Sequence, residues 1–335
     1  MDSFSDRPRS ADRLHSADRP RSRAAQIRCQ DGNHTLELTD RELVAERLLR
    51  TSRKHSFDPD VDVDWDASQD PDQFYMPPQL VSLYETPLWE ELTHRQRVEL
   101  SKHEVCSMVS FGIWSELLLM QGLIQHAYRN RYDSGHFAYA MTEVADECRH
   151  SKMFGQMVRA CGLKTHRVHR VPFNLGKALN VVCDPMPMFA GILAVEEFTD
   201  AFQRLTFPDE EIQPLIRQVA RIHVIEEARH IKYAREELKR MVAKAAPARR
   251  WLAAYCIARW AWMASGQMTH PSCYRAVGLD PALARRVARH SPHRRATIAW
   301  SFRKCTAFFE EVGFLDGPAR TVWVKSGLLT CTADS

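Results

Sequence analysis

The chain has 335 residues, of which 44% are hydrophobic and 26% charged, and its formal net charge at pH 7 is +4. This composition suffices for one large hydrophobic core, while the small charge and the scattered basic residues argue against nucleic acid as a partner. The nine cysteines include no C-x-x-C pair, which argues against a disulfide framework or a thiolate zinc site and favours a reducing, cytoplasmic setting. No run approaches the roughly 18 uninterrupted apolar residues of a membrane span, so no membrane partner is expected.

The N-terminal part of the chain divides into a tail and a short helical segment. Residues 1–30 are rich in Arg, Ser and Pro and repeat the pentapeptide DRPRS, which predicts a disordered basic tail. Within residues 31–90, helical periodicity from Thr39 to His55 predicts one helix, and an Asp- and Pro-rich linker follows it. We expect this helix to pack outside the main core.

Four long stretches with helical periodicity follow, at residues 94–130, 137–161, 187–207 and 209–245. Pro208 ends the third stretch, and Asp209 is a suitable N-cap for the fourth. Strand signals are nearly absent, so we predict an all-α protein with an antiparallel four-helix bundle at residues 91–245. Residues 246–335 are predicted to cover this bundle with further helices, which lie between residues 248 and 315.

Two five-residue segments share one pattern, DECRH at residues 146–150 and EEARH at residues 226–230. Each segment places a Glu and a His at positions i and i+3, and the resulting pairs are Glu147 with His150 and Glu227 with His230. Residues three apart lie one turn apart on the same helix face, so both side chains of a pair can bind one metal ion.

Each pair is preceded by a single glutamate at the same distance. Glu116 lies 31 residues before Glu147. Glu196 likewise lies 31 residues before Glu227, so the two halves are offset by 80 residues throughout. A step of this length leads from the middle of one long helix to the middle of its antiparallel neighbour. The spacing therefore predicts two helix hairpins that face each other across a pseudo-twofold axis.

Both single glutamates lie in strongly apolar stretches, where a buried carboxylate needs a cation or a proton. His223 lies four residues before Glu227, on the same helix stripe, and provides a seventh donor. Four carboxylates and three imidazoles without a thiolate suit iron, with manganese as the alternative. The predicted metal ligands are therefore Glu116, Glu147, His150, Glu196, His223, Glu227 and His230.

The residues that flank these ligands can support the site. Asp146 and Glu226 each precede a ligand glutamate and can accept the outer N–H of a ligand histidine. Arg149 and Arg229 can hold carboxylates in place. A plainer interpretation is that these two arginines neutralise the glutamates in a helical protein that binds no metal. The duplication of the whole pattern favours the metal site, and the sequence assigns no catalytic residue beyond it.

At these residues the chain resembles the p-aminobenzoate N-oxygenase family of non-haem di-iron oxygenases, which belong to the ferritin-like superfamily. The resemblance extends from about residue 61 to residue 239, and its most specific motif is His223-x-x-x-Glu227-x-x-His230. It implies a ferritin-like four-helix bundle with additional N- and C-terminal helices, two iron ions, dioxygen as co-substrate and a homodimer. It also implies oxidation of an arylamine nitrogen.

We therefore expect a dioxygen-dependent di-iron monooxygenase that oxidises an amine nitrogen of a small molecule. A hydroxylase or desaturase that acts on carbon and a ferritin-like iron-oxidising protein are the alternatives. The sequence has no dinucleotide-binding turn, flavin signature or iron–sulfur cysteine cluster, so we expect an external electron donor or peroxide. If the substrate carries a carboxylate, we expect one C-terminal arginine to bind it, such as Arg294, Arg295 or Arg303.

Overall fold

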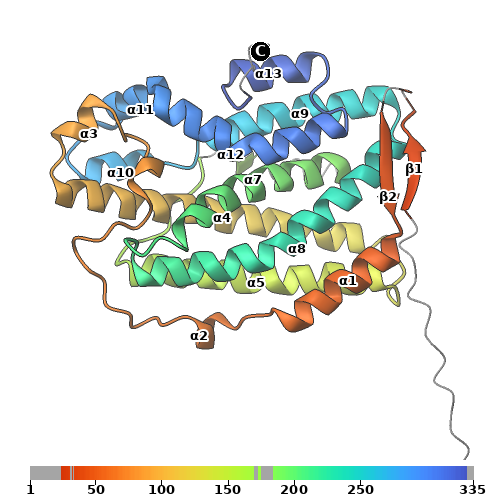
Figure 1. Cartoon of the computed structure of the whole chain (residues 1–335), viewed down its shortest axis with the longest axis horizontal. Helices are drawn as coiled ribbons and strands as arrows, with labels where there is room; N and C mark the ends of the chain where they lie inside the picture. The colour runs from red at the N-terminus through yellow and green to blue at the C-terminus, as the bar shows by residue number, and fades with distance from the viewer. Residues whose placement is uncertain (1–23, 31, 33, 170–172, 175–183, 330–335) are drawn as a thin grey trace, which may run out of the picture.

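The computed structural model describes residues 24–30, 32, 34–169, 173–174 and 184–329, and Figure 1 shows how they are arranged. The described chain opens with a hairpin of two antiparallel strands, β1 (Ala24–Arg28) and β2 (Thr35–Thr39), in which Ala24 lies opposite Thr39. Short elements follow, namely α1 (Arg41–Lys54), α2 (Pro59–Asp62), the 3-10 helix η1 (Pro78–Leu80) and α3 (Pro87–Glu91).

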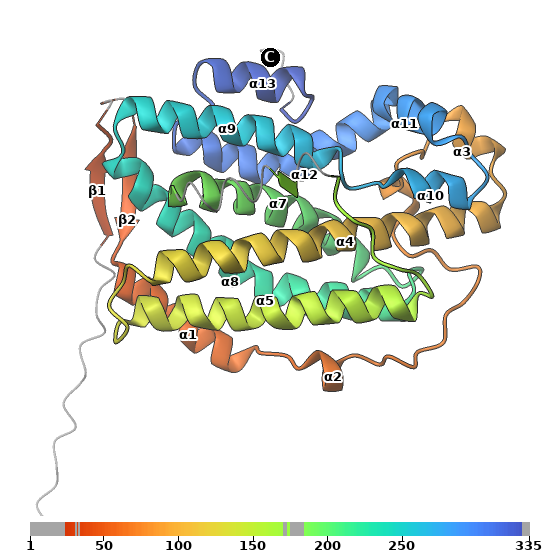
Figure 2. The same ribbon diagram turned by 180° about the vertical axis from the view of Figure 1, so that it is seen from behind.

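Four long helices form the centre of the molecule. They are α4 (His94–Ala127), α5 (Gly135–Ala160), α7 (Pro185–Thr206) and α8 (Pro214–Lys244). Helix α4 packs against α5 and α7 packs against α8, and the two hairpins meet through contacts of α4 with α7 and of α5 with α8. Figures 1 and 2 show these four helices from opposite sides of the molecule. The predicted all-α fold with a four-helix bundle is thereby confirmed.

Local sequence signals explain where three of these helices begin. Thr93 and Gln96 form a capping box at the start of α4, in which each side chain bonds to the backbone of the other residue. Ser134 caps α5 and Asp184 caps α7 through backbone N–H groups of the first turn. These side chains satisfy donors that the helix itself leaves without an acceptor.

The fourth helix begins later than predicted. The sequence indicated a start at Asp209, but α8 begins at Pro214. The residues between them are held by a distant loop, because the Gln213 N–H donates to the Phe74 carbonyl at 3.0 Å and Ile212 forms a β-bridge with Phe74. Pro214 then fits the first helical turn, since that position needs no N–H donor and suits its fixed φ. Asp209 instead caps a short turn.

The sequence did not predict the β-hairpin, which overlaps the range 1–30 assigned to a disordered tail. Residues 1–23 lie outside the described residues, but β1 occupies residues 24–28, and that part of the prediction is wrong. The sequence of β1, AAQIR, begins with two apolar residues and does not alternate throughout, and all five residues are exposed, so it gave no clear strand signal. Leu36 and Leu38 of β2 are buried, and β2 contacts α8, which holds the hairpin in place.

Helices also cover the bundle after residue 246. They are α9 (Pro247–Ser265), α10 (Pro271–Ala276), α11 (Pro281–His290), α12 (Pro292–Glu311) and α13 (Pro318–Lys325). Helices α9 and α12 pack on α7, and α13 packs on α9, so this region lies along one side of the bundle (Figure 1). Its core is aromatic, with the Trp323 ring 5.8 Å from the rings of both Phe302 and Phe309.

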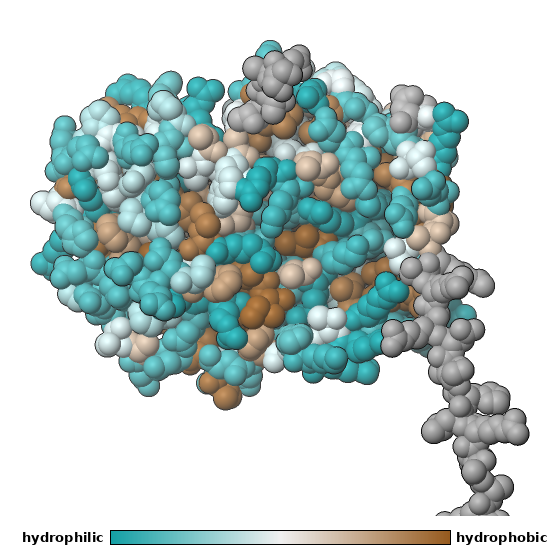
Figure 3. All heavy atoms as spheres, in the orientation of Figure 1, coloured by the Kyte–Doolittle hydropathy of each residue, from teal (hydrophilic) through white to brown (hydrophobic). Residues whose placement is uncertain are grey.

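Among the described helices, α4 is long and apolar enough to cross a membrane by length and composition. It packs against α5, α7 and α10, however, and 61% of its most apolar window is buried inside the protein. Figure 3 shows mostly hydrophilic residues over the face in view, with hydrophobic residues scattered between them. We therefore interpret α4 as a core helix of the bundle.

A buried ion-pair cluster connects α1 to one end of the bundle. Arg41 donates to both oxygens of Glu237, at 2.9 and 2.6 Å, and also to Asn130. Burial raises the pKa of Glu237, but hydrogen bonds from His126 and Arg41 outweigh this effect and leave the pKa at about 2. His126, His136 and Glu237 lie close enough together to hold a metal ion, but Arg41 already supplies the positive charge there.

Replacing Glu237 with Gln leaves Arg41 without its ionic partner. We expect the free energy of unfolding at pH 7 to fall by roughly 3 kcal/mol, which corresponds to the difference in the pKa of Glu237 between the folded and unfolded protein. Because the folded-state pKa is lowered, this stabilisation is complete above the ordinary pKa of 4.5 and is lost as the pH falls toward 2. Urea unfolding of both proteins at pH 7 and at about pH 3.5 measures the effect.

Glu310→Gln is the control, because it removes an exposed ion pair with Arg320. It should change the stability by less than about 1 kcal/mol at both pH values. A stability difference for Glu237→Gln that stays constant between the two pH values would contradict the assignment.

Candidate metal centre

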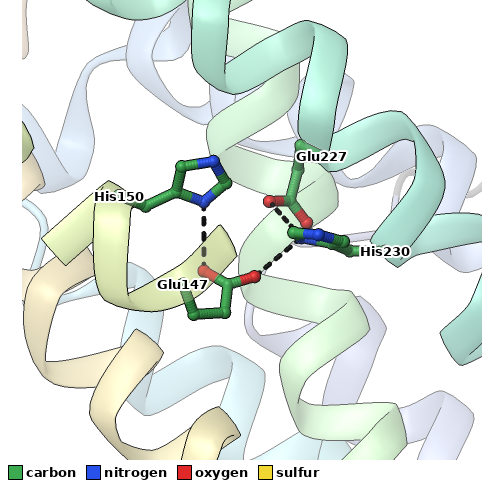
Figure 4. A group of neighbouring side chains, drawn as sticks. All are labelled: Glu147, His150, Glu227 and His230. Carbon is green, nitrogen blue, oxygen red and sulfur yellow. Dashed lines mark hydrogen bonds and ion pairs between the residues drawn. The ribbon is translucent and has the colours of Figure 1, made fainter. Parts of the chain in front are cut away.

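The two duplicated motifs meet in the middle of the bundle. Figure 4 shows Glu147 and His150 from α5 facing Glu227 and His230 from α8. One ligand atom from each residue lies within 4.8 Å of the ligand atoms of the other three, and all four residues are fully buried. The structure thus brings together the two halves that lie 80 positions apart in the sequence.

Glu147 and Glu227 lie between the two halves of the site. Glu147 Oε2 is 3.1 Å from His150 Nδ1, and Glu147 Oε1 is 2.7 Å from His230 Nδ1. Glu227 Oε2 is 3.3 Å from His230 Nδ1 and 3.5 Å from His223 Nε2. Carboxylates that face both halves have the geometry of bridges between two metal ions. This geometry favours Glu147 and Glu227 as the bridging residues, which the sequence left open.

The other three predicted ligands lie around this pair. His223 Nε2 is 3.7 Å from Glu116 Oε1, and the ring centroids of His223 and His150 are 4.7 Å apart. His223 Nδ1 donates to Gln203 Oε1 at 2.7 Å, which leaves the Nε2 lone pair for a metal ion. Glu196 on α7 is buried beside the second motif. All seven predicted ligands therefore share one buried site.

The carboxylates of this site lack sufficient positive charge. Burial, and then the neighbouring carboxylates, raise the pKa of Glu116 and of Glu196 well above the usual range. Both oxygens of Glu196 and Oε1 of Glu227 are buried without a hydrogen-bond partner among the described residues. Burying unpaired carboxylate oxygens is costly. Two metal ions would satisfy these oxygens and remove the repulsion, so the residues fit a di-metal centre of the iron or manganese type.

The histidines differ in charge. Burial lowers the pKa of His150, but the charge of Glu147 and hydrogen bonds to Glu147 and Glu226 raise it to about 9. Burial also lowers the pKa of His230, and Glu147 is the first of several groups that raise it well above the usual range. Burial and the neighbouring His150 lower the pKa of His223 to about 4. Imidazolium groups at His150 and His230 offset only part of the carboxylate charge in the metal-free protein, and metal binding must release their protons.

The acidic residues next to the motifs bind the histidines crosswise. Glu226, from the second motif, accepts from His150 Nε2 at 2.9 Å. Asp146, from the first motif, accepts from His230 Nε2 at 3.2 Å. Each bond fixes an imidazole so that its Nδ1 faces the site. The crosswise bonds also join α5 to α8 without any metal ion.

The two arginines bind these outer acids. Arg229 Nη2 is 3.1 Å from Asp146 Oδ2 and 3.6 Å from Glu226 Oε1. Arg149 also donates to Asp146. Within the described part of the chain, neither arginine forms an ion pair with a ligand glutamate. The alternative in which Arg149 and Arg229 neutralise the ligand carboxylates is therefore not supported.

Sequence reasoning missed two buried residues beside the site. Gln203 orients His223 and lies seven residues after Glu196, so the helix stripe of that glutamate would have indicated it. Glu143 lies four residues before Glu147 on α5 and is 2% exposed. The one-turn spacing that singled out His223 would have indicated Glu143 as well.

An apolar pocket adjoins one side of the site, and Glu116, Glu196 and His223 form part of its wall. Most of the remaining wall is apolar and comes from α4, α5, α7 and α9, including Met108, Leu119, Phe154, Met188, Ile257 and Trp260. No Lys or Arg lines this pocket among the residues that the structure describes. Arg294 and Arg295 line a separate pocket, and the arginine contact expected for a substrate carboxylate stays a prediction.

Two helix hairpins that each supply a glutamate and a Glu-x-x-His pair to a buried centre define a carboxylate-bridged di-metal protein of the ferritin-like class. Residues 38–313 match the P-aminobenzoate N-oxygenase AurF family. The chain belongs to this family, and it is a di-metal oxygenase.

The chain is similar at low sequence identity to proteins of two mycobacteria and to two solved oxidase structures. Uncharacterized proteins of Mycobacterium tuberculosis and Mycobacterium bovis are 24% identical over 285 residues, which cover 82% of this chain and 84% of each relative. Two structures of R2-like ligand-binding oxidase mutants with an Mn/Fe cofactor are 13% identical, with TM-scores of 0.47 and 0.48. Each match covers 81% of this chain. The matches cover 93% of the first oxidase chain and 92% of the second.

Replacing Asp146 with Asn should weaken metal binding without removing a ligand. The amide is a poorer acceptor for His230 and a poorer partner for Arg229, so we expect the metal affinity to fall about 10- to 100-fold. Asp200→Asn is the matched control, because Asp200 is equally buried but pairs with Arg204 and Lys304 on the side facing α12. Calorimetric titration of the metal-free proteins with Mn(II) measures the metal affinity of both variants and of the wild type. Equal affinities in Asp146→Asn and the wild type would rule out the supporting role of Asp146.

Proposed function

We propose that this protein is a non-haem di-iron monooxygenase that oxidises the amine nitrogen of a small, largely apolar arylamine with dioxygen. The observation that carries the proposal is the apolar pocket beside Glu116, Glu196 and His223. An organic substrate requires such a pocket next to the metal ions, whereas storage or oxidation of iron does not. Membership of the family supports nitrogen as the atom that is oxidised.

The protein itself would hold the ligands and exclude water. The crosswise bonds keep His150 and His230 oriented toward the metal positions. Phe154 and Trp260 offer aromatic faces on which an arylamine ring can pack, with its nitrogen toward the glutamates. The described pocket wall contains no cation to bind a carboxylate, which favours an uncharged arylamine as the substrate.

The proposed reaction requires two electrons from outside the chain. One oxygen atom of dioxygen is transferred to nitrogen and the other becomes water, so each turnover consumes two electrons and two protons. The sequence contains no flavin or iron–sulfur motif, and we therefore propose an external electron donor. Hydrogen peroxide, which supplies the oxygen atom and the electrons together, is the alternative. When bound, the two iron ions supply the dioxygen chemistry.

Reconstitution with Fe(II), followed by exposure to dioxygen with an uncharged arylamine and a chemical reductant, tests this function. We expect about two iron ions per chain and hydroxylamine or nitro products. Glu227→Ala removes a bridging carboxylate, so it should bind at most about one iron ion per chain and form no product. Glu310→Ala, at an exposed position, should change neither result. Elemental analysis and mass spectrometry provide the measurements.

Other outcomes distinguish the alternatives. Products hydroxylated or desaturated at carbon would show that the same centre oxidises carbon instead of nitrogen. Many iron ions per chain would indicate a ferritin-like protein. Tightly bound zinc, or no metal after reconstitution, would contradict the di-iron centre itself.

Filling the pocket should block the substrate and leave the metal centre intact. Gly112 lines the pocket, and a Cβ there would meet only Phe154, at 3.8 Å. We expect Gly112→Leu to raise the KM for the arylamine at least about tenfold while the iron content stays at the wild-type value. Gly155→Leu on α5 is the matched control, because a Cβ there meets nothing within 4 Å and Gly155 does not line the pocket. Unchanged kinetics in Gly112→Leu would place the substrate elsewhere.

A further inference from the structure

The symmetry of the site points to one more residue. Corresponding ligands of the two halves lie 80 positions apart, as Glu147 and Glu227 do. Applied to His223, the same offset leads to Glu143. Both residues lie four positions before a bridging glutamate, on the stripe of their helix that faces the site. His223, the donor that α8 adds to its Glu-x-x-His pair, therefore has Glu143 as its counterpart on α5.

Glu143 is a buried carboxylate that lacks a full set of hydrogen-bond partners among the described residues. It is 2% exposed, and its Oε2 has no hydrogen-bond partner among the described residues. Glu104 on α4 is buried to a similar extent, but both of its oxygens accept hydrogen bonds from Ser82. A carboxylate that is buried without such bonds requires a cation or a proton, because it has lost the water that would stabilise it.

Glu143 lies within electrostatic range of His230 and Glu196. Burial raises the pKa of Glu143 well above its usual range, and His230 is the charge that opposes this most strongly. The charge of Glu143 in turn raises the pKa of both Glu196 and His230. His223 lies in the other half, 3.7 Å from Glu116. Glu143 therefore neighbours His230 and Glu196, whereas His223 neighbours Glu116, as the symmetry of the sequence predicts.

We propose that Glu143 is an eighth ligand and binds the metal ion next to Glu196. It mirrors His223, which is placed to bind the metal ion next to Glu116. The inference rests on the di-metal centre proposed above. Each metal ion would then be offered three side chains of its own half together with the two bridging glutamates.

An eighth ligand makes the two metal positions chemically different. The half with Glu116 offers one carboxylate and two imidazoles, whereas the half with Glu143 offers two carboxylates and one imidazole. Carboxylates suit manganese, and imidazoles suit iron. The Glu143 half should therefore bind Mn(II) more tightly than the other half, and a mixture of the two metals should distribute unequally between the positions.

Titration of metal-free protein with Mn(II) tests this assignment. Glu143→Gln should lower the affinity of one of the two positions at least about tenfold and leave the other unchanged. The melting temperature of the metal-free variant should not fall, because the substitution removes an unpaired buried carboxylate. Glu104→Gln is the control, since it weakens satisfied hydrogen bonds. It should lower the melting temperature and leave both Mn(II) affinities unchanged.

The outcomes separate this inference from the proposed function. Two Mn(II) ions bound by Glu143→Gln with wild-type affinities would overturn the eighth ligand and leave the di-metal centre in place. A wild type that binds neither Mn(II) nor Fe(II) would overturn the centre itself. If Glu143→Gln does not fold, a crystal structure of the Mn(II)-loaded wild type decides. A Glu143 oxygen at about 2.2 Å from the metal supports the assignment, and a carboxylate without metal contact overturns it.

Discussion

The bundle depends on a layer of ionisable side chains buried between two helix hairpins. Four glutamates and three histidines lie there, in the interior of the bundle, where most residues of the core are apolar. Apolar packing cannot stabilise this layer, because buried carboxylates repel one another and have lost their water. The stabilisation must come from opposite charge, supplied by the imidazolium groups of His150 and His230 in the metal-free protein and by metal ions when they bind.

Asp146 and Glu226 make this layer compatible with a folded, metal-free protein. Each accepts from the histidine of the opposite motif, so the imidazoles are oriented before a metal ion arrives. Metal ions then replace protons in a site that is already built. Because each acid reaches across to the other hairpin, the bonds that orient the ligands also fix the rotation of α5 relative to α8. Folding and ligand orientation are thus set by the same contacts.

Helix geometry explains how much of this site could be predicted from the sequence. Residues spaced by three, four or seven share one face of a helix, so the duplicated spacing predicted the bundle and brought the seven donors together. Spacing does not reveal how two helices are rotated relative to each other, and so the crosswise bond from His230 to Asp146 could not be predicted. The late start of α8 depends on Phe74 in a distant loop. The strand β1 has no apolar alternation that could have indicated it.

Part of the pocket wall comes from α9, a helix that supplies no predicted metal ligand, so the choice of substrate can change separately from the metal chemistry. All predicted ligands lie on the four bundle helices, whereas α9 adds Ile257 and Trp260 to the pocket wall. Gly191 lets α9 approach α7 closely, since a Cβ there would lie 3.4 Å from Trp260. Substitutions in α9 can therefore change which molecule enters without altering the ligand layer. The same metal chemistry can then act on different substrates, because the ligand motif fixes the metal centre while α9 helps to shape the space beside it.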